Sequence, residues 1–158
     1  MPKIDDVDRR ILRELQIDAR RSNKALAEAA GVSPPTALSR IRALEARGVI
    51  RGYHATVDPV ALGREVQAIV SVRIQPKTEA VLRDIVDRVW ALDDTVAVTL
   101  VTGSVDMLVH LAVSDISTLS ERVLMSIASL PNVVDEQTSI VFEHRDKHVW
   151  GTAPHGGA

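Results

Sequence analysis

The first 57 residues show the spacing of apolar positions that is typical of α-helices. Between residues 5 and 18, Val7, Ile11 and Leu15 recur every four positions, and an aspartate at 5 or 6 can cap the predicted helix. A second helix is predicted over 24–30. It ends at Gly31, because glycine readily adopts the left-handed conformation with which many helices end.

A third helix is predicted to begin after Ser33, which can act as its N-cap. Pro34 and Pro35 fit its first turn, where a backbone N–H is not needed. A short helix, a brief turn containing glycine and a longer helix together indicate a helix-turn-helix. Residues 49–57 then predict a short strand or hairpin in the position of a wing.

From residue 66 the pattern changes to strands that alternate with helices. Strands are predicted over 67–74, 96–101, 107–113 and 133–142, and helices over 77–91 and from Asp115 to Pro131. The order β-α-β-β-α-β predicts a ferredoxin-like α+β sandwich with both helices on one face of the sheet. The other face also carries apolar residues, so we expect it to meet another subunit.

These patterns divide the chain into four parts. We predict a winged helix-turn-helix domain over 1–57, a linker over 58–65, a ferredoxin-like domain over 66–143 and a tail over 144–158. The tail is polar and glycine-rich, and we expect it to be partly disordered. Trp150 in this tail has no explanation from the sequence.

Composition narrows the classes of protein further. The absence of cysteine excludes disulfides, thiol nucleophiles and thiolate metal sites. No apolar run is long enough to span a bilayer and the N-terminus lacks the apolar core of a signal peptide, so we expect a cytoplasmic protein without membrane contact. The net charge of −2 combines +4 over residues 1–55 with −6 over 56–158, so only the N-terminal part is expected to meet a polyanion.

The third helix would carry the residues that read DNA, because the second helix of a helix-turn-helix lies in the major groove. Thr36, Ser39 and Arg40 are predicted to face outward near its start, where hydroxyls can bond several bases and arginine can pair with guanine. The candidate DNA-binding residues, most of the basic ones placed for phosphates, are Arg20, Arg21, Lys24, Ser33, Thr36, Ser39, Arg40, Arg42 and Arg47. Spacing alone also allows a plain three-helix bundle with a solvated basic face.

Several runs resemble the Lrp/AsnC (feast/famine) family of regulators. The strongest match is Ser-Arg-Ile-Arg-Ala-Leu-Glu-Ala-Arg-Gly-Val-Ile-Arg-Gly-Tyr at 39–53, and Ile-Asp-Asp-Val-Asp-Arg-Arg-Ile-Leu-Arg-Glu-Leu-Gln at 4–16 supports it. Further matches are Leu26-Ala27, Gly31-Val32-Ser33, Asp58-Pro59, Leu62-Gly63, Val101-Thr102-Gly103 and Asp106. The resemblance spans roughly residues 4–143.

The resemblance implies a DNA-binding winged helix-turn-helix and a C-terminal domain that dimerises by joining sheets, with dimers assembling into tetramers or octamers. It also implies that an amino acid or related metabolite binds between subunits and that the protein controls genes of amino-acid metabolism. The effector-binding candidates are Val101, Thr102, Gly103, Ser104, Val105, Asp106, Gln137 and Thr138.

The loop at 102–106 has two interpretations. A glycine lets backbone N–H groups approach a carboxylate, and Asp106 could accept from an α-ammonium group. The residues alone favour a tight hairpin with glycine and aspartate as turn residues. The resemblance favours the effector site, although many relatives carry an acidic or amide residue where Ser104 stands and an aromatic residue where Met107 stands.

Other chemistry finds little support in the sequence. The histidines at 54, 110, 144, 148 and 155 match no compact set of metal ligands, and His110 is interpreted as a hydrogen-bonded structural residue. The acidic pairs Asp93-Asp94 and Asp135-Glu136 fall at the edges of elements, where such pairs are usually solvated. No nucleophile elbow or phosphate-binding loop is present. We therefore expect no metal, no cofactor besides an amino-acid effector, and no enzymatic activity.

The sequence thus predicts a sequence-specific DNA-binding transcription regulator that responds to an amino acid or related small metabolite. Its expected partners are double-stranded DNA, the effector and further copies of the same chain. The alternative is an oligomeric ligand-binding sensor that acts through protein contacts without binding DNA.

Overall fold

The computed structural model describes residues 4–147, 149 and 150. The described residues up to Ala55, together with those from Arg145 on, form one compact unit, and Thr56–His144 form a second. The division falls two residues before the predicted end of the first domain, and the described part of the predicted tail groups with the first unit. Much of the tail that we expected to be partly disordered lies outside the described residues, and so do His148 and His155.

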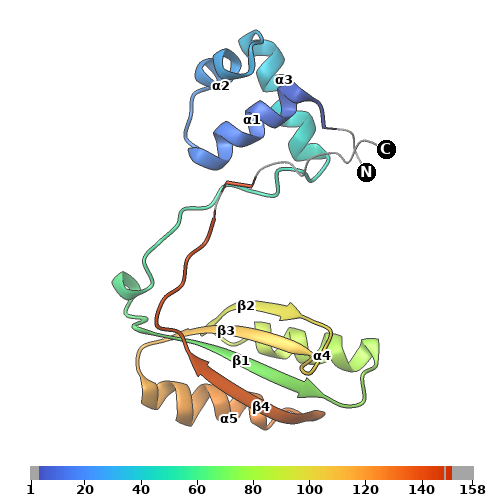
Figure 1. The fold of residues 1–158 in the computed structure, drawn as a ribbon, viewed down its shortest axis with the longest axis vertical. Helices are drawn as coiled ribbons and strands as arrows, with labels where there is room; N and C mark the ends of the chain where they lie inside the picture. Colours follow the sequence, from blue (N-terminus) through green and yellow to red (C-terminus); the bar gives the residue numbers. More distant parts are fainter. Residues whose placement is uncertain (1–3, 148, 151–158) are drawn as a thin grey trace. The chain divides into compact units, whose positions relative to one another are not determined.

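The described residues of the first unit form three helices, α1 (Asp6–Ile17), α2 (Asn23–Ala30) and α3 (Pro34–Ala46), as predicted (Figure 1). The predicted cap of α1 is Asp5, whose side chain accepts from the backbone N–H of Asp8 at 2.9 Å. Ser22 caps α2 at its N-terminus, and Gly31, with φ of +71°, is its C-cap. The core of the unit is built from the buried side chains Ile11, Ala27, Ala30 and Ala37.

The expected strand or hairpin at 49–57 is absent. These residues form no strand and pair with no other segment of the described chain. A strand needs a partner for its backbone N–H and C=O groups, and β-propensity alone does not supply one. The helices of the predicted helix-turn-helix are therefore present, but the wing is not a β-structure in this chain.

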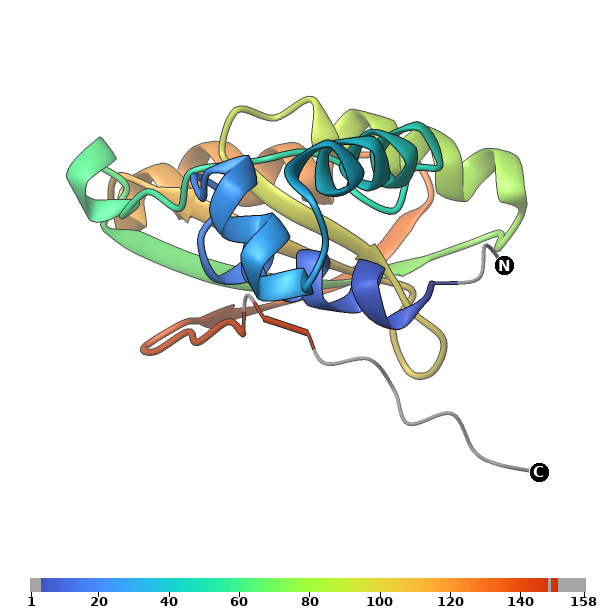
Figure 2. The ribbon, with the colours of Figure 1, turned by 90° about the horizontal axis from the view of Figure 1, so that it is seen from above.

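The second unit is an α+β sandwich with the predicted order of elements. Its strands are β1 (Val66–Ile74), β2 (Thr95–Leu100), β3 (Met107–Val113) and β4 (Val133–Ile140), and its helical segments are α4 (Glu79–Trp90), η2 (Thr118–Leu124) and α5 (Met125–Ala128). All neighbouring strands are antiparallel in the order β2-β3-β1-β4, which is the order of a ferredoxin-like sheet. Figure 2 shows α4 and α5 on the same side of the sheet.

Burial confirms that one face of the sheet meets the helices. Val70 and Val72 on β1 and Val109 on β3 are fully buried, in one core with Ile85 and Val89 of α4. The second helix continues through η2, whose turns are π-helical. Leu119 and Val123 of η2 and Ile127 of α5, spaced four residues apart, are buried in the same core.

The predicted linker over 58–65 belongs to the second unit. It contains a short 3₁₀ segment, η1 (Val60–Leu62), which Gly63 ends with φ of +73°. The next residue, Arg64, donates to the carboxylate of buried Asp94 at 3.1 Å and to the backbone carbonyl of Asp93 at 2.9 Å. None of the helices among the described residues has the length and apolar character needed to cross a bilayer.

Candidate DNA-binding and effector sites

The outward face of α3 carries two of the predicted base-reading residues. Thr36 and Ser39 are exposed, whereas Ala37 and Leu44 on the same helix are fully buried. The hydroxyl of Ser33 accepts from the backbone N–H of Thr36 at 3.4 Å and lies 2.8 Å from the Thr36 hydroxyl. The core therefore sets which side of α3 faces outward, and that side presents hydroxyl groups near the start of the helix.

A residue that the sequence analysis missed joins α2 to α3. The side-chain amide of Asn23, in the first turn of α2, donates to the carbonyl of Pro34 at 2.8 Å. Pro34 is the first residue of α3, so this bond connects the beginnings of the two helices of the motif. A capping residue could be read from the sequence, but a bond between helices eleven positions apart could not.

The basic residues predicted to meet phosphates fall into two groups. Arg20 and Arg47, which flank helices, and Lys24 and Arg42, which lie on α2 and α3, are exposed. Arg21 is engaged in an ion pair with Glu14 at 2.6 Å. Arg21 therefore has a role within the unit that would compete with phosphate binding.

Arg40 does not occupy the outward position that we predicted. Its guanidinium forms ion pairs with both Asp5 and Asp8, and the distance from Nη1 to Asp8 Oδ1 is 3.0 Å. Asp8 is buried, so the pair ties α3 to the beginning of α1. These ion pairs give Arg40 a structural role between the third helix and the first, while its side chain remains 35% exposed and its base reading stays a prediction.

The same cluster changes the acidity of Asp5. The hydrogen bond from the Asp8 backbone and the contact with Arg40 hold the pKa of the Asp5 carboxyl below its ordinary value. The two carboxylates likewise raise the pKa of Arg40. The cap of α1 and the anchor of α3 therefore share one charged cluster.

The loop between β2 and β3 has its ends closed by the backbone and its centre exposed. Val101 donates to the Asp106 carbonyl at 3.0 Å, and Asp106 donates to the Val72 carbonyl at 2.9 Å. Residues 102–104 between them are exposed. Gly103 has φ of +136°, and a Cβ at that position would meet nothing within 4 Å. The loop therefore exposes its centre around Gly103, which agrees with both interpretations of the sequence.

Asp106, predicted as an acceptor for an effector ammonium, already has two partners within this chain. It is buried, its Oδ2 accepts from the backbone N–H of Ile74 at 2.9 Å, and its Oδ1 lies 2.7 Å from Nζ of Lys77. The hydrogen bond from Lys77 has the largest effect in holding the pKa of this carboxyl below its ordinary value, and the hydrogen bond from the Ile74 backbone adds to it. An effector ammonium would have to compete with Lys77, a residue that the sequence analysis did not single out.

Gln137 and Thr138 lie on opposite faces of the sheet. Gln137 pairs with Ser71 of β1 and is exposed, whereas Thr138 pairs with fully buried Val70 and faces the helices. Successive residues of a strand point to opposite faces, so the two side chains cannot line one pocket within this chain.

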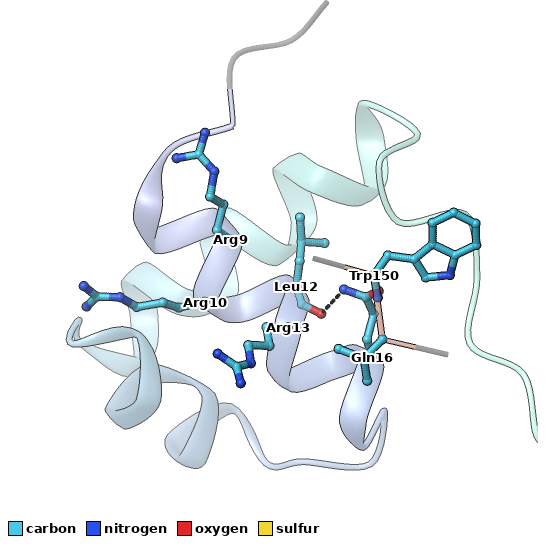
Figure 3. Close-up of a pocket in the computed structure, with 7 residues that line it drawn as sticks. Arg9, Arg10, Leu12, Arg13, Gln16 and Trp150 are labelled. Atoms are coloured by element: carbon cyan, nitrogen blue, oxygen red, sulfur yellow. Dashed lines mark hydrogen bonds between the residues drawn. The ribbon is translucent and has the colours of Figure 1, made fainter. Parts of the chain in front are cut away.

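The tail residue that the sequence left unexplained lies against α1. The backbone N–H of Trp150 donates to the side-chain oxygen of Gln16 at 2.7 Å. Val149 and Trp150 line a cavity of about 460 Å³ with Leu12, Gln16 and three arginines of α1, namely Arg9, Arg10 and Arg13. Figure 3 shows the arginine side chains directed away from Trp150, whose own side chain is 79% exposed.

The remaining candidates have structural partners. His110 Nε2 lies 3.1 Å from the side-chain oxygen of Gln67, as expected of a hydrogen-bonded structural histidine, and its ring lies 5.3 Å from that of His144. Among the residues that the structure describes, no three acidic or histidine side chains gather in a group that could hold a metal ion.

Comparison with known protein families matches both units. An AsnC-type helix-turn-helix domain matches residues 4–45, and an Lrp/AsnC ligand-binding domain matches residues 67–150. The first match covers α1, α2 and nearly all of α3, and the second begins within β1 and runs beyond β4.

Individual relatives match over most of their length. The HTH-type transcriptional regulator AldR of Mycolicibacterium smegmatis is 37% identical over 141 residues, covering 89% of this chain and 82% of the relative. The leucine-responsive regulatory protein of Escherichia coli K12 is 34% identical over 140 residues, covering 89% and 85%.

Solved structures agree with these matches. A transcriptional regulator of Neisseria meningitidis, solved as a complex with L-methionine, has a TM-score of 0.83 at 29% identity and covers 92% of this chain and 94% of its own. The feast or famine regulatory protein of M. tuberculosis, complexed with L-methionine, has a TM-score of 0.81 at 30% identity, covering 92% and 96%.

Proposed function

The chain belongs to the Lrp/AsnC family of transcription regulators, and from this premise we propose how its own residues carry the two activities. The first unit would bind DNA by placing α3 in the major groove. The second would bind an amino acid or related metabolite at the β2–β3 loop and bias the DNA-binding state of the assembly. Control of genes of amino-acid metabolism is the biological role that this pair of activities supports.

The observation that carries the DNA-binding proposal is the exposed hydroxyl surface of α3. Thr36 and Ser39 project from a helix whose opposite side is fixed by buried Ala37 and Leu44. Lys24 on α2 and Arg42 on α3 are exposed and would neutralise phosphates. Such contacts set the affinity for DNA rather than the choice of sequence. Arg40 would contribute by positioning α3.

The effector proposal is supported by two relatives of similar fold that were solved with L-methionine. An effector can shift an equilibrium only by its different affinity for the two states, and couplings of about 1–3 kcal/mol are typical. We further propose that the chain acts as a dimer or larger homo-oligomer, because a dimer can place two recognition helices on half-sites about 34 Å apart.

A binding measurement with labelled DNA tests the proposal. The full-length protein is titrated against genomic fragments, including that upstream of its own coding region, and against random DNA at two salt concentrations. We expect at least one fragment to bind more tightly than random DNA, with affinity that falls steeply as salt rises, by a slope of about 0.9 per phosphate neutralised. No preference for any fragment would favour the alternative, a sensor that acts through protein contacts.

A matched pair of serine variants identifies the reading surface. Ser39→Ala removes one exposed hydroxyl from α3 and should weaken specific binding by about 5- to 150-fold, the scale of about 1–3 kcal/mol for a lost base contact, while leaving binding to random DNA nearly unchanged. Ser120→Ala removes an exposed hydroxyl from η2 in the second unit and should change neither. Equal behaviour of the two variants would remove Ser39 from base readout.

A further inference from the structure

The ion pair at the end of the β2–β3 loop exposes its cation rather than its anion. Asp106 is buried at the end of the loop, whereas the side chain of Lys77, whose Nζ lies 2.7 Å from Asp106 Oδ1, is 55% exposed. The carboxylate therefore faces inward and the ammonium outward. Arg73 adds a second positive charge near Asp106, and it is itself 3.9 Å from Asp135.

Lys77 is held in place by the backbone as well as by its ion pair. It lies three residues after the end of β1 and directly before Thr78, the N-cap of α4. Ile74, the last residue of β1, donates to the other oxygen of the same Asp106 carboxylate at 2.9 Å. Asp106 thus holds both the backbone of Ile74, where the β1–α4 connection begins, and the ammonium group of Lys77 within that connection. The ammonium group is therefore preorganised beside the β2–β3 loop.

The ammonium group retains capacity for a second acceptor. A lysine ammonium has three N–H donors and no acceptor, and the bond to Asp106 uses one of them. The neighbouring residues 102–104 are exposed, and the space beside Gly103 is open, so a ligand can approach the loop backbone closely. The chemistry that fits a held ammonium beside exposed backbone is a carboxylate.

Resting on the effector function proposed above, we propose that Lys77 binds the carboxylate of the effector, so that the ligand class is a small metabolite recognised through its carboxylate group. In this arrangement Asp106 acts as the positioning residue for Lys77 rather than as the acceptor for the effector's ammonium. Lys77, and not Asp106, then determines whether an acid is preferred over a neutral analogue.

The test compares L-amino acids with their carboxamides, which keep the side chain and the ammonium but lose the negative charge. Calorimetric titration of the full-length protein with the twenty L-amino acids selects the tightest, and its carboxamide is then titrated (for example L-methionine and L-methioninamide). For the unmodified protein, we expect the amide to bind about 10- to 100-fold more weakly, the usual range for a charge-assisted hydrogen bond. This comparison needs no variant and so does not depend on the folding of one.

Three variants connect that preference to Lys77. Lys77→Met should abolish the preference for the acid, and Lys77→Arg should retain most of it, since guanidinium also binds carboxylates. Arg83→Met is the matched control, because it removes one positive charge from an exposed ion pair with Glu79 on α4, and it should leave the preference unchanged. A variant that only disturbed the loop would weaken acid and amide by the same factor.

The outcomes separate the two proposals. Equal binding of acid and amide to the unmodified protein, or a full preference retained in Lys77→Met, would overturn the assignment of Lys77 while leaving effector binding established. Failure of all twenty amino acids to bind would overturn the effector part of the proposed function, and this inference with it.

Discussion

The buried isoleucine of α1 allows a sharp test of how the DNA-binding unit is stabilised. Ile11 is fully buried in a core that it shares with Ala27, Ala30 and Ala37. Ile17 lies on the same helix and is 52% exposed. Ile11→Ala and Ile17→Ala therefore delete the same atoms from one helix at two very different depths.

The magnitude follows from burial. Truncation of a fully buried isoleucine to alanine costs about 2–5 kcal/mol, whereas surface substitutions usually cost within about 0.5 kcal/mol. A unit of about 55 residues has a stability of roughly 3–8 kcal/mol at typical values per residue. Ile11→Ala would remove much of this stability, and DNA affinity would fall in proportion to the fraction of the unit that remains folded.

Hydrogen exchange measured by mass spectrometry provides the assay, because it resolves the two units in one sample. At about 1.36 kcal/mol per decade, a loss of 2 kcal/mol accelerates exchange through unfolding about 30-fold, and larger losses accelerate it further. Peptides of α2 and α3 should show this acceleration in Ile11→Ala and little change in Ile17→Ala, and peptides of β1 and β3 should exchange at the same rate in both. Equal acceleration in the two variants, or acceleration that extends to the sheet, would refute the view that this small core alone stabilises the unit.

Two further predictions concern the charged cluster at the start of α1. Arg40→Ala should weaken binding to specific and to random DNA by the same factor, because it loosens the attachment of α3 to Asp5 and Asp8 rather than deleting a base contact; a selective loss of specific binding, measured by anisotropy, would return Arg40 to base reading. Asp5 has a lowered pKa in the folded protein, so it contributes stability above the ordinary value of 3.8 that is lost as the pH falls through the lowered value. Asp5→Asn should therefore be less stable than the unmodified protein at pH 7 and converge with it in acid, as followed by urea denaturation across pH; a constant difference at every pH would show that the Asp5 charge is not responsible.

Local patterns were sufficient for the elements of both units. Helical spacing and caps predicted α1, α2 and α3, since Asp5, Ser22 and Ser33 act on backbone groups within three residues. Alternation predicted the four strands, and their order along the chain predicted the ferredoxin-like sheet. The wing was predicted wrongly because residues 49–57 have the composition of a strand but find no pairing partner among the described residues.

The candidate sites were predicted less well, because charged side chains choose partners that lie far away in sequence. Arg40 was expected to face outward, yet it reaches carboxylates more than thirty positions earlier. Asp106 was expected to await a ligand, yet a lysine from the β1–α4 connection already occupies it. Nothing in the spacing of either residue distinguishes a free charge from a paired one.

The amino-acid sequence by itself determined which segments become helices and strands, which faces of them are apolar, and to which family the resemblance points, because these properties depend on residues within a few positions of one another. Only the tertiary structure decided which charges meet, since ion pairs such as Arg40 with Asp8 and Lys77 with Asp106 form after the core has brought distant segments together. The apolar pattern that places a side chain in the core can be read locally, whereas a hydrogen bond depends on a few tenths of an ångström between groups from distant segments. The roles of individual charged residues are therefore the part of the function that required the fold.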